Sequence, residues 1–302
     1  MDHLKPSSQA GRLLLVDGHA YAYRAFFAIR ELRSPDGQPT NAIFGFSKML
    51  QKLHARLEPS HLIVIWDAGL DARRMELLPD YKAQRPTTPV SLEEQLPQLL
   101  DFIQASGFST VAVDGVEADD LIGSYALNGA SGGWDVIIAS SDKDFMQLVR
   151  PGIRLSNPSD KTDRLWSDED VIQKTGVQPS QIVDYLSLIG DSVDNINGVP
   201  GVGPKTAVEL LNQFGSIEAM LANVANIASA RIRSAVDTHR EVLKRNKQLI
   251  GLRVDLQLPK HINQCSVGCA DSVELCRLYS RWGFHSMKND LETRGATQPA
   301  LL

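Results

Sequence analysis

Carboxylate side chains follow four apolar runs of the sequence, and this arrangement indicates a site for divalent metal ions. Two more aspartates lie in the stretch GDSVDNINGVPGVGPKTA (190–207). Carboxylates in one crevice repel one another, by about 1 kcal/mol for a pair 4 Å apart in water and about 4 kcal/mol at an effective dielectric constant of 20. Such a site needs cations, and hard oxygen ligands favour two Mg²⁺ ions, with Mn²⁺ as the alternative, over Zn²⁺. The candidate ligands are Asp17, Asp67, Glu117, Asp119, Asp120, Asp142, Asp144, Asp191 and Asp194.

Two divalent ions held about 4 Å apart suit phosphoryl chemistry, because one activates water while the other stabilises the leaving oxygen. Phosphodiester hydrolysis by this route needs no covalent nucleophile, and the chain contains no G-x-S-x-G motif. Any single one of these aspartates has a plainer explanation as a helix N-cap. Carboxylates after all four apolar runs are harder to explain as four separate helix caps, so we interpret the set as a metal centre. His19 is expected to pack or to face solvent instead of acting as a base.

The apolar runs that precede the carboxylates predict buried parallel strands. Segments with helical periodicity follow them, for example from Ala42 and from Glu117, and this alternation indicates an α/β fold with a mainly parallel sheet. The carboxyl ends of such strands line one crevice, which would gather the acidic side chains. Two further β-prone runs, GIRLS and DRLWS, would extend the sheet. The predicted strands cover 12–16, 61–66, 109–113 and 134–139.

The character of the sequence changes after Trp166. From there to about Leu252 it predicts mainly helices, interrupted by the glycine-rich stretch. One more helix is expected over 272–284, followed by a polar end that frays. We therefore expect an α/β part, a helical part and a C-terminal helical tail, over 11–166, 167–258 and 259–302 respectively.

The glycine-rich stretch resembles a nucleotide-binding loop but fails its pattern. Pro204 separates Gly203 from the Lys-Thr pair, whereas a Walker loop requires G-x-x-x-x-G-K-[ST]. The pattern fits a helix–hairpin–helix, in which glycines let backbone amides approach a phosphate at the start of the following helix. Such contacts hold a nucleic-acid backbone without reading its bases. The candidate contacts in the hairpin 198–207 are Gly198, Val199, Gly201, Gly203, Lys205 and Thr206.

The composition limits the class of protein. A formal net charge of −5 argues against a protein that coats nucleic acid by charge alone. No run of about 18 apolar residues is present, and the first residues lack the apolar stretch of a secretion signal, so we expect a cytoplasmic protein without a membrane partner. The spacing of His261, Cys265, Cys269 and Cys276 lacks the C-x2-C pairs of a zinc site and favours reduced thiols.

Seven motifs between residues 11 and 258 occur in an order that resembles the 5′-nuclease family. This family includes the N-terminal 5′→3′ exonuclease domain of bacterial DNA polymerase I and the flap endonucleases. The resemblance implies a PIN-like nuclease core, with a mainly parallel sheet flanked by helices, and a helical three-turn DNA-binding subdomain. The motifs are LLLVDGHAYAYRAFFA, AIFGFSKML, VIWDA, LPDYKAQR, EADDLIG, SSDKDFMQLV and GDSVDNINGVPGVGPKTA.

The resemblance also implies roles for single residues. The segment over about 70–100 resembles a helical arch through which the 5′ strand passes. Arg24, Lys82 and Arg85 match catalytic basic residues that approach the scissile phosphate, and Tyr81 matches an aromatic residue on which a nucleotide stacks. Every acidic position of the family is filled in this chain. A K⁺ ion between the hairpin and DNA is a further expectation.

The leading hypothesis is a metal-dependent 5′→3′ exonuclease and structure-specific 5′-flap endonuclease of replication and repair. The implied substrates are DNA with 5′ flaps, nicks or 5′ ends and RNA primer ends in RNA–DNA duplex. The implied partner is a DNA polymerase, and the implied location is the nucleoid. Two alternatives stay open: a catalytically silent scaffold for branched DNA, and a PIN-type ribonuclease. A haloacid-dehalogenase-like phosphatase fits poorly, because it needs D-x-D where this chain has Asp17-Gly18-His19.

Overall fold

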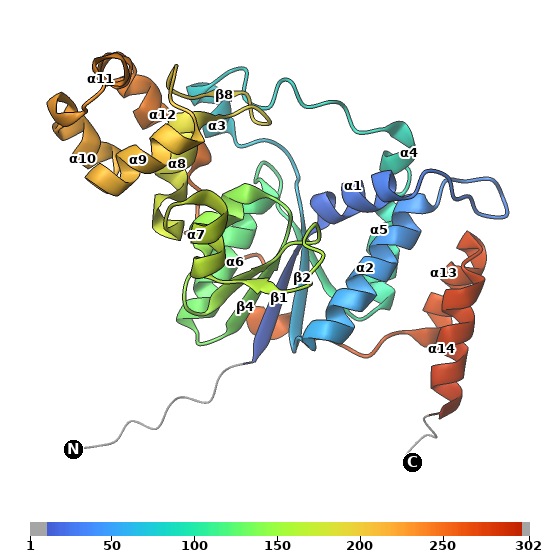
Figure 1. The fold of residues 1–302 in the computed structure, drawn as a ribbon. Coiled ribbons are helices and arrows are strands. Elements are labelled where there is room, and N and C mark those ends of the chain that lie inside the picture. The colour runs from blue at the N-terminus through green and yellow to red at the C-terminus, as the bar shows by residue number, and fades with distance from the viewer. Residues whose placement is uncertain (1–10, 298–302) are drawn as a thin grey trace, which may run out of the picture.

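A six-stranded sheet forms the centre of the protein, with helices on both faces (Figure 1). The computed structural model describes residues 11–297. The strands lie in the order β3-β2-β1-β4-β5-β6, and all neighbours are parallel except β5 and β6. This architecture confirms the predicted α/β fold with a mainly parallel sheet. The strands are β1 (Arg12–Asp17), β2 (His61–Trp66), β3 (Ser109–Ala112), β4 (Asp135–Ala139), β5 (Ile153–Ser156) and β6 (Leu165–Trp166).

The strand order places the end of β1 at a topological switch point. From β1 the chain adds β2 and β3 on one side and then crosses over to add β4 and β5 on the other. Leu13 of β1 accordingly pairs with His61 of β2 and with Val136 of β4. In open α/β sheets, ligands bind in the crevice outside the carboxyl ends of the strands at such a point. Because β1 ends at Asp17, this residue lies in the crevice.

Alternate side chains of the strands enter two hydrophobic clusters, one on each face of the sheet. Leu13 belongs to the cluster that contains α6 (Ala118–Ser131), whereas Leu14 belongs to the cluster that contains α1 (Gly18–Ala28) and α2 (Asn41–Leu57). Successive side chains of a strand point to opposite faces, and helices bury both faces of a parallel sheet. The uninterrupted apolar runs that predicted the strands have this cause.

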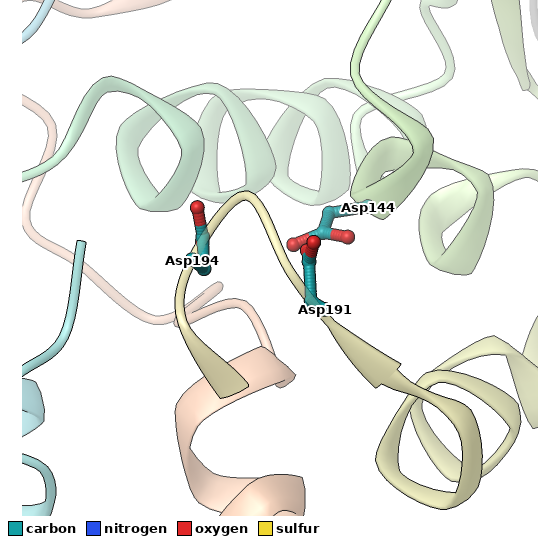
Figure 2. Close-up of side chains that lie close together, drawn as sticks. All are labelled: Asp144, Asp191 and Asp194. Atoms are coloured by element: carbon teal, nitrogen blue, oxygen red, sulfur yellow. The ribbon is translucent and has the colours of Figure 1, made fainter. Parts of the chain in front are cut away.

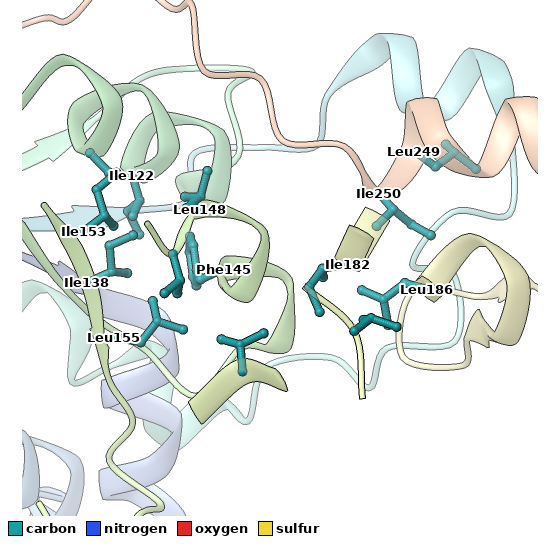
Figure 3. Packing of buried hydrophobic residues seen from close by; sticks show 14 of the residues in the cluster. Ile122, Ile138, Phe145, Leu148, Ile153, Leu155, Ile182, Leu186, Leu249 and Ile250 are labelled. Atoms are coloured by element: carbon teal, nitrogen blue, oxygen red, sulfur yellow. The ribbon is translucent and has the colours of Figure 1, made fainter. Parts of the chain in front are cut away.

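The segment after β6 forms a helical subdomain that shares its core with the sheet. The hydrophobic cluster of Figure 3 extends from Ile138 of the sheet through Phe145 to Ile182 and Leu249 of this subdomain. The two parts are therefore joined by continuous apolar packing. None of the helices in the described chain has the length and apolar character to span a bilayer. The helices of this subdomain are α7 (Asp168–Thr175), α8 (Ile182–Ile189), α9 (Pro204–Phe214), α10 (Ile217–Ala222), α11 (Ala230–Thr238) and α12 (Arg240–Ile250), with short 3₁₀ helices at Pro179–Gln181 (η2) and Val224–Asn226 (η3). Another 3₁₀ helix, η1 (Lys143–Leu148), follows β4.

The segment expected as a helical arch is largely irregular. It contains α3 (Ala72–Leu77) and α4 (Val90–Glu93) and leads into α5 (Leu96–Ala105). Between α3 and α4 the chain forms turns and an extended stretch that includes Pro86 and Pro89. Proline lacks the backbone N–H that a continuous helix needs. Figure 1 shows this segment passing above the carboxyl ends of the strands, from α3 to α4.

The C-terminal tail returns to the α/β core. Its helix α13 (Ser272–Trp282) buries Trp282, whose Nε1–H donates to Gln98 (2.6 Å). A short 3₁₀ helix (Ile262–Gln264, η4) precedes it. Most of the polar end that was expected to fray forms α14 (His285–Thr297), and the residues after Thr297 lie outside the described part of the chain. Met287 and Leu291, one turn apart, pack against the core, so one narrow apolar row suffices to dock an otherwise polar helix.

A buried ion pair joins three parts of the molecule. Arg74 of α3 donates from Nη1 and Nη2 to the two carboxylate oxygens of Asp120 in α6, each at 2.8 Å. Its Nε donates to the backbone carbonyl of Leu249 in α12 (2.9 Å). Arg74 and Asp120 are 4% and 0% exposed, so neither charge has water as an alternative partner. The pair fixes the base of the arch segment to both the α/β core and the helical subdomain.

Replacing Arg74 by methionine should lower the free energy of unfolding by about 3–5 kcal/mol, because Asp120 would remain as an unpaired buried charge. Urea unfolding followed by circular dichroism measures this change. Arg73→Met is the matched control: the Arg73 side chain is 60% exposed, and its loss should cost less than about 1 kcal/mol. If both variants lose the same free energy of unfolding, the buried pair stabilises the fold no more than an exposed pair does.

Candidate active site

Asp17, at the end of β1, is the first residue of the site. Its Oδ1 accepts a hydrogen bond from the backbone N–H of Ala20 (3.0 Å) and so caps α1, and its Oδ2 accepts one from the Ser140 hydroxyl (2.7 Å). Burial is the main cause that raises the pKa of Asp17 to about 7, and the charges of Asp67 and Asp142 contribute. The fold thus holds a carboxylate where its negative charge is poorly solvated, and a bound cation would relieve this cost.

Asp142 and Asp144 follow β4 and repeat this arrangement. Oδ1 of Asp142 accepts the backbone N–H of Asp144 (2.9 Å) and caps η1. Burial raises the pKa of both carboxyl groups, and repulsion from Asp191 and Asp194 acts in the same direction. Oδ1 of Asp144 is buried without a hydrogen-bond partner in the described chain. An acceptor in this position is suited to a cation.

Asp67 and Asp119 complete the wall of one cavity. Oδ1 of Asp67, after β2, accepts the backbone N–H of Ala118 (2.8 Å), and Asp119 lies in the first turn of α6. Burial, followed by the charge of Asp142 among others, raises the pKa of Asp119 well above its usual range. Asp17, Asp67, Asp119 and Asp142 line a single cavity of about 560 Å³. The structure therefore brings together carboxylates from four strand ends, as the sequence predicts.

A second group of carboxylates adjoins the first. One oxygen each of Asp144, Asp191 and Asp194 lies within 4.8 Å of the others. Figure 2 shows Asp191 and Asp194 on the two sides of the turn that joins β7 (Gly190–Asp191) to β8 (Ile196–Asn197), with Asp144 close to Asp191. A cavity of about 280 Å³ is lined by Asp191 and Asp194 together with Asp17 and Asp142. The two groups thus share a wall.

Two predicted ligands point elsewhere. Glu117 is 2% exposed, and its Oε2 lies 2.6 Å from Nζ of Lys82 and 3.2 Å from Nη1 of Arg74, so it binds cationic side chains behind the cavity. Both oxygens of Asp120 are held by Arg74, which removes Asp120 from the cavity wall. The cause is helix geometry: successive residues of a helix diverge by about 100°, so Asp119 and Asp120 cannot face the same cavity.

Three cationic side chains neutralise part of the acidic site. Lys82 is 8% exposed and pairs with Glu117, while Nη2 of Arg85 lies 2.6 Å from Oδ1 of Asp194. Both Lys82 and Arg85 line the larger cavity, as the resemblance implies. Sequence reasoning missed the third cation, Lys143, whose Nζ lies 2.7 Å from Oδ2 of Asp191. Its place between two aspartates in the motif DKD was the available signal.

Arg24 and Tyr81 do not line the carboxylate cavity. Arg24 lies outside on α1, where its Nη1 donates to Ser159 (2.9 Å) and its side chain lines a neighbouring pocket. Tyr81 is 3% exposed, and its hydroxyl lies 3.3 Å from carboxylate oxygens of Glu117 and Asp194. The ring of Tyr81 is thus enclosed by the protein in this structure, and the stacking of a nucleotide on it stays a prediction.

The glycine hairpin divides into structural and exposed residues. Val199 is buried, and a Cβ on Gly198 would lie 2.3 Å from the carbonyl carbon of Ile189, so both residues pack the turn, and their predicted contacts with DNA stay predictions. Gly201 and Gly203 are exposed, and Gly201 has φ +83°, a conformation that favours glycine. Lys205, in the first turn of α9, is exposed, and Thr206 is half-buried. The exposed part can approach a phosphate.

Two family models match consecutive parts of the chain. The 5′-3′ exonuclease N-terminal resolvase-like domain matches residues 12–176, and the 5′-3′ exonuclease C-terminal SAM fold matches residues 177–272. The chain belongs to the 5′-3′ exonuclease family. It is 37% identical over 284 residues to DNA polymerase I of Bacillus caldotenax, covering 93% of this chain and 32% of the polymerase. It is 39% identical over 246 residues to a 5′-3′ exonuclease of Aquifex aeolicus, covering 82% and 83% of the two chains.

Solved structures share the fold of this exonuclease-family chain. T5 5′-exonuclease with bound divalent metal ions (zinc) has a TM-score of 0.67 and 22% identity, covering 93% of this chain and 98% of that one. The catalytic core of Rad2 in complex with a DNA substrate has a TM-score of 0.64 and 14% identity, covering 93% and 90%. At these identities the likeness shows the fold. The chain spans about a third of the length of its DNA polymerase I relatives, 32% for that of Bacillus caldotenax.

The residues of this exonuclease-family site fit divalent metal ions. Buried carboxylates with raised pKa values, a partnerless oxygen of Asp144 and an all-oxygen donor set are the features that hard cations stabilise. Within residues 11–297, His261 and the three cysteines form no group of metal ligands, and the cysteines are free thiols. Asp17, Asp67, Asp119 and Asp142 would hold one ion, and Asp144, Asp191 and Asp194 the other.

Lys143 should compete with a metal ion for Asp191. In Lys143→Met, which keeps the length of the side chain, the melting temperature in EDTA should fall because Asp191 loses its counterion. The Mg²⁺ concentration that gives half of the thermal stabilisation should fall about fivefold, which corresponds to about 1 kcal/mol for a partly exposed pair. Differential scanning fluorimetry over a Mg²⁺ series measures both quantities. Lys174→Met, an exposed lysine of α7, is the control, and a Mg²⁺ midpoint unchanged in Lys143→Met would contradict the competition.

Proposed function

We propose that this chain is a metal-dependent 5′→3′ exonuclease and 5′-flap endonuclease that hydrolyses phosphodiester bonds of DNA. One observation carries the proposal: carboxylates from four strand ends and from the β7–β8 turn line two adjoining cavities, with Lys82 and Arg85 in the wall. This arrangement suits the binding of two cations and a phosphate between them. The names of the relatives, 5′-3′ exonuclease and DNA polymerase I, support the same reaction.

The acidic and the basic side chains of the site would have different roles. The carboxylates would hold two Mg²⁺ ions, with Mn²⁺ as the alternative; when bound, such ions activate water and neutralise charge on the phosphate. Lys82 and Arg85 face the larger cavity and would attract the phosphate oxygens there. Arg24, in the next pocket along α1, would extend the positive surface outward. His19 is unsuited to act as a base, since its Nδ1 lies 3.2 Å from the backbone nitrogen of Asp67 and burial lowers its pKa.

The exposed part of the hairpin would hold the DNA backbone. Gly201, Gly203 and the first N–H groups of α9 can come close to a phosphate, and Lys205 adds a positive charge. The guanidinium of Arg231 lies beside Gly201, 3.2 Å from the position that a Cβ would take. A K⁺ ion between the hairpin and DNA rests on the family resemblance alone.

The proposed substrates are DNA with 5′ flaps, nicks or 5′ ends, and RNA primer ends in RNA–DNA duplex. Contacts to phosphates do not read bases, so they admit any sequence at the junction. A DNA polymerase is the proposed partner, because relatives that carry this segment are DNA polymerases I. The nucleoid in the cytoplasm is the proposed location, because such DNA lies there.

Asp142→Asn should reduce cleavage of a 5′-labelled flap substrate in Mg²⁺ by more than about 100-fold, since even residues behind metal ligands contribute 10- to 100-fold. Binding to the same substrate in Ca²⁺ should survive, and Asp290→Asn, an exposed carboxylate of α14, should cut normally. Gel analysis of the products and fluorescence anisotropy measure the two quantities. No cleavage by the unaltered chain would favour a DNA-binding scaffold, and preferred cleavage of single-stranded RNA would favour a PIN-type ribonuclease.

Lys205→Ala should weaken binding of every flap sequence to a similar extent. The slope of log K against log salt concentration should become shallower by about 1, because one phosphate contact is lost. Anisotropy titrations in Ca²⁺ at several KCl concentrations provide the slope. Lys174→Ala serves as a control with the same change of charge, and an unchanged slope in Lys205→Ala would remove the hairpin from the DNA interface.

A further inference from the structure

An apolar cavity of about 500 Å³ lies beside the carboxylate site and has no role in the mechanism above. Its volume falls in the range of ligand pockets, about 300–1,000 Å³. Helix α5 supplies Leu96 and Leu100, the edge strand β3 supplies Thr110, and the end of β2 supplies Trp66. Leu100 is 41% exposed, so the cavity opens to solvent.

The indole of Trp66 forms a fixed wall of this cavity. Its Nε1–H donates to the Thr110 hydroxyl (2.9 Å), and its ring stacks on Phe46 with centroids 5.9 Å apart. The imidazole of His19 meets it edge-on, with centroids 5.2 Å apart. A Cβ on Gly18 would lie 2.6 Å from the indole, so glycine at this position lets the ring lie against the start of α1. The wall is therefore aromatic and held in place from several sides.

The cavity adjoins the carboxylate cavity. His19 and Asp67 line both. A single molecule can therefore occupy the two cavities, with one part at the carboxylates and another part against Trp66. A nucleotide has this construction, because its phosphate and its base are separate groups joined by a sugar.

The charges around the apolar cavity select a neutral group. No lysine or arginine of the described chain lines it, whereas Asp67 and Glu93 do. Two carboxylates repel a phosphate, which has Lys82 and Arg85 available in the neighbouring cavity. An uncharged, flat and largely apolar group suits the site, and the Thr110 hydroxyl keeps a hydrogen that it can donate to a ring nitrogen or a carbonyl.

We propose that this apolar cavity binds the nucleobase of a nucleotide adjacent to the bond that is cut. The inference rests on the proposed nuclease function and adds a base-binding subsite to it. Because Trp66 is 6% exposed and stacked on Phe46, the base would contact the edge of the indole together with Leu96 and Leu100, and such apolar contact is tolerant of sequence. The base would thus help to unstack the strand at the junction and to hold its phosphate at the carboxylates.

A double-substitution experiment tests the subsite. One flap substrate is intact, and in two others an abasic residue replaces the nucleotide on one or the other side of the cut bond. With the unaltered chain, one of the two abasic substrates should be cut at least about fivefold more slowly at limiting enzyme than the intact substrate. Leu100→Trp, which fills the cavity, and Leu100→Asn, which removes an apolar wall, should cut the intact and abasic substrates at similar rates. Val273→Trp, at an 82% exposed position of α13, is the control and should keep the full difference.

The outcomes separate the subsite from the nuclease function. If the unaltered chain does not cut the intact flap, the proposed function fails. If it cuts the flap but neither abasic residue slows the reaction, or if both Leu100 variants keep the same abasic penalty, only the subsite is overturned. Melting temperatures of the variants identify loss of folding. Anisotropy of labelled flap DNA in Ca²⁺, with tighter binding of the intact than of the abasic substrate, gives a second measurement that needs no cleavage.

Discussion

Mutual repulsion among buried carboxylates is the constraint on which the rest of this structure depends. Six acidic side chains line two adjoining cavities, Asp144 lies beside Asp191 and Asp194, and burial raises the pKa of Asp17, Asp119, Asp142 and Asp144. The sheet causes this repulsion, because parallel strands bring all their carboxyl ends to one edge. Backbone N–H groups at helix starts along the same edge donate to several of these carboxylates and partly stabilise their charge. Asp17 is therefore an N-cap, and this role is compatible with its predicted role as a metal ligand.

Cationic side chains neutralise part of the carboxylate charge. They belong to segments that are not part of the sheet edge. Lys82 and Arg85 come from the arch segment, and Lys143 comes from the turn after β4. Pairs between Lys143 and Asp191 and between Arg85 and Asp194 are partly exposed, so their cations can leave when a metal ion or a phosphate arrives. The pair between Arg74 and Asp120 is buried and has a different role, because it fixes the base of the arch segment. Exposure thus separates the ion pairs that can exchange from those that hold the fold.

The sequence predicts the features that depend on the local pattern of residues. It does not predict which way a side chain points once the helices have packed. Strands and the carboxylates at their ends follow from apolar runs, because strand pairing in a parallel sheet is set by burial on both faces. The burial of Tyr81 and the pairing of Asp120 follow from the way α3 and α6 pack, which no spacing along the chain reveals. Helix α14 was missed because its apolar row consists of Met287 and Leu291 among polar neighbours. Lys143 was overlooked because a lysine between aspartates is ordinarily taken for a solvated surface residue.

A net charge of −5 is compatible with an enzyme that acts on DNA because the charges are separated in space. The carboxylates lie in cavities, where bound cations would reverse their sign, whereas Lys205 and Arg231 lie on or beside the exposed hairpin. The apolar cavity beside Trp66 is lined by Glu93 and by Asp67, which also lines the carboxylate cavity, and by no lysine or arginine of the described chain. The proposed base subsite fits this separation of charge. Phosphates would lie at the carboxylate cavities and at the hairpin, and an uncharged base would lie in the cavity that offers a phosphate no cationic partner.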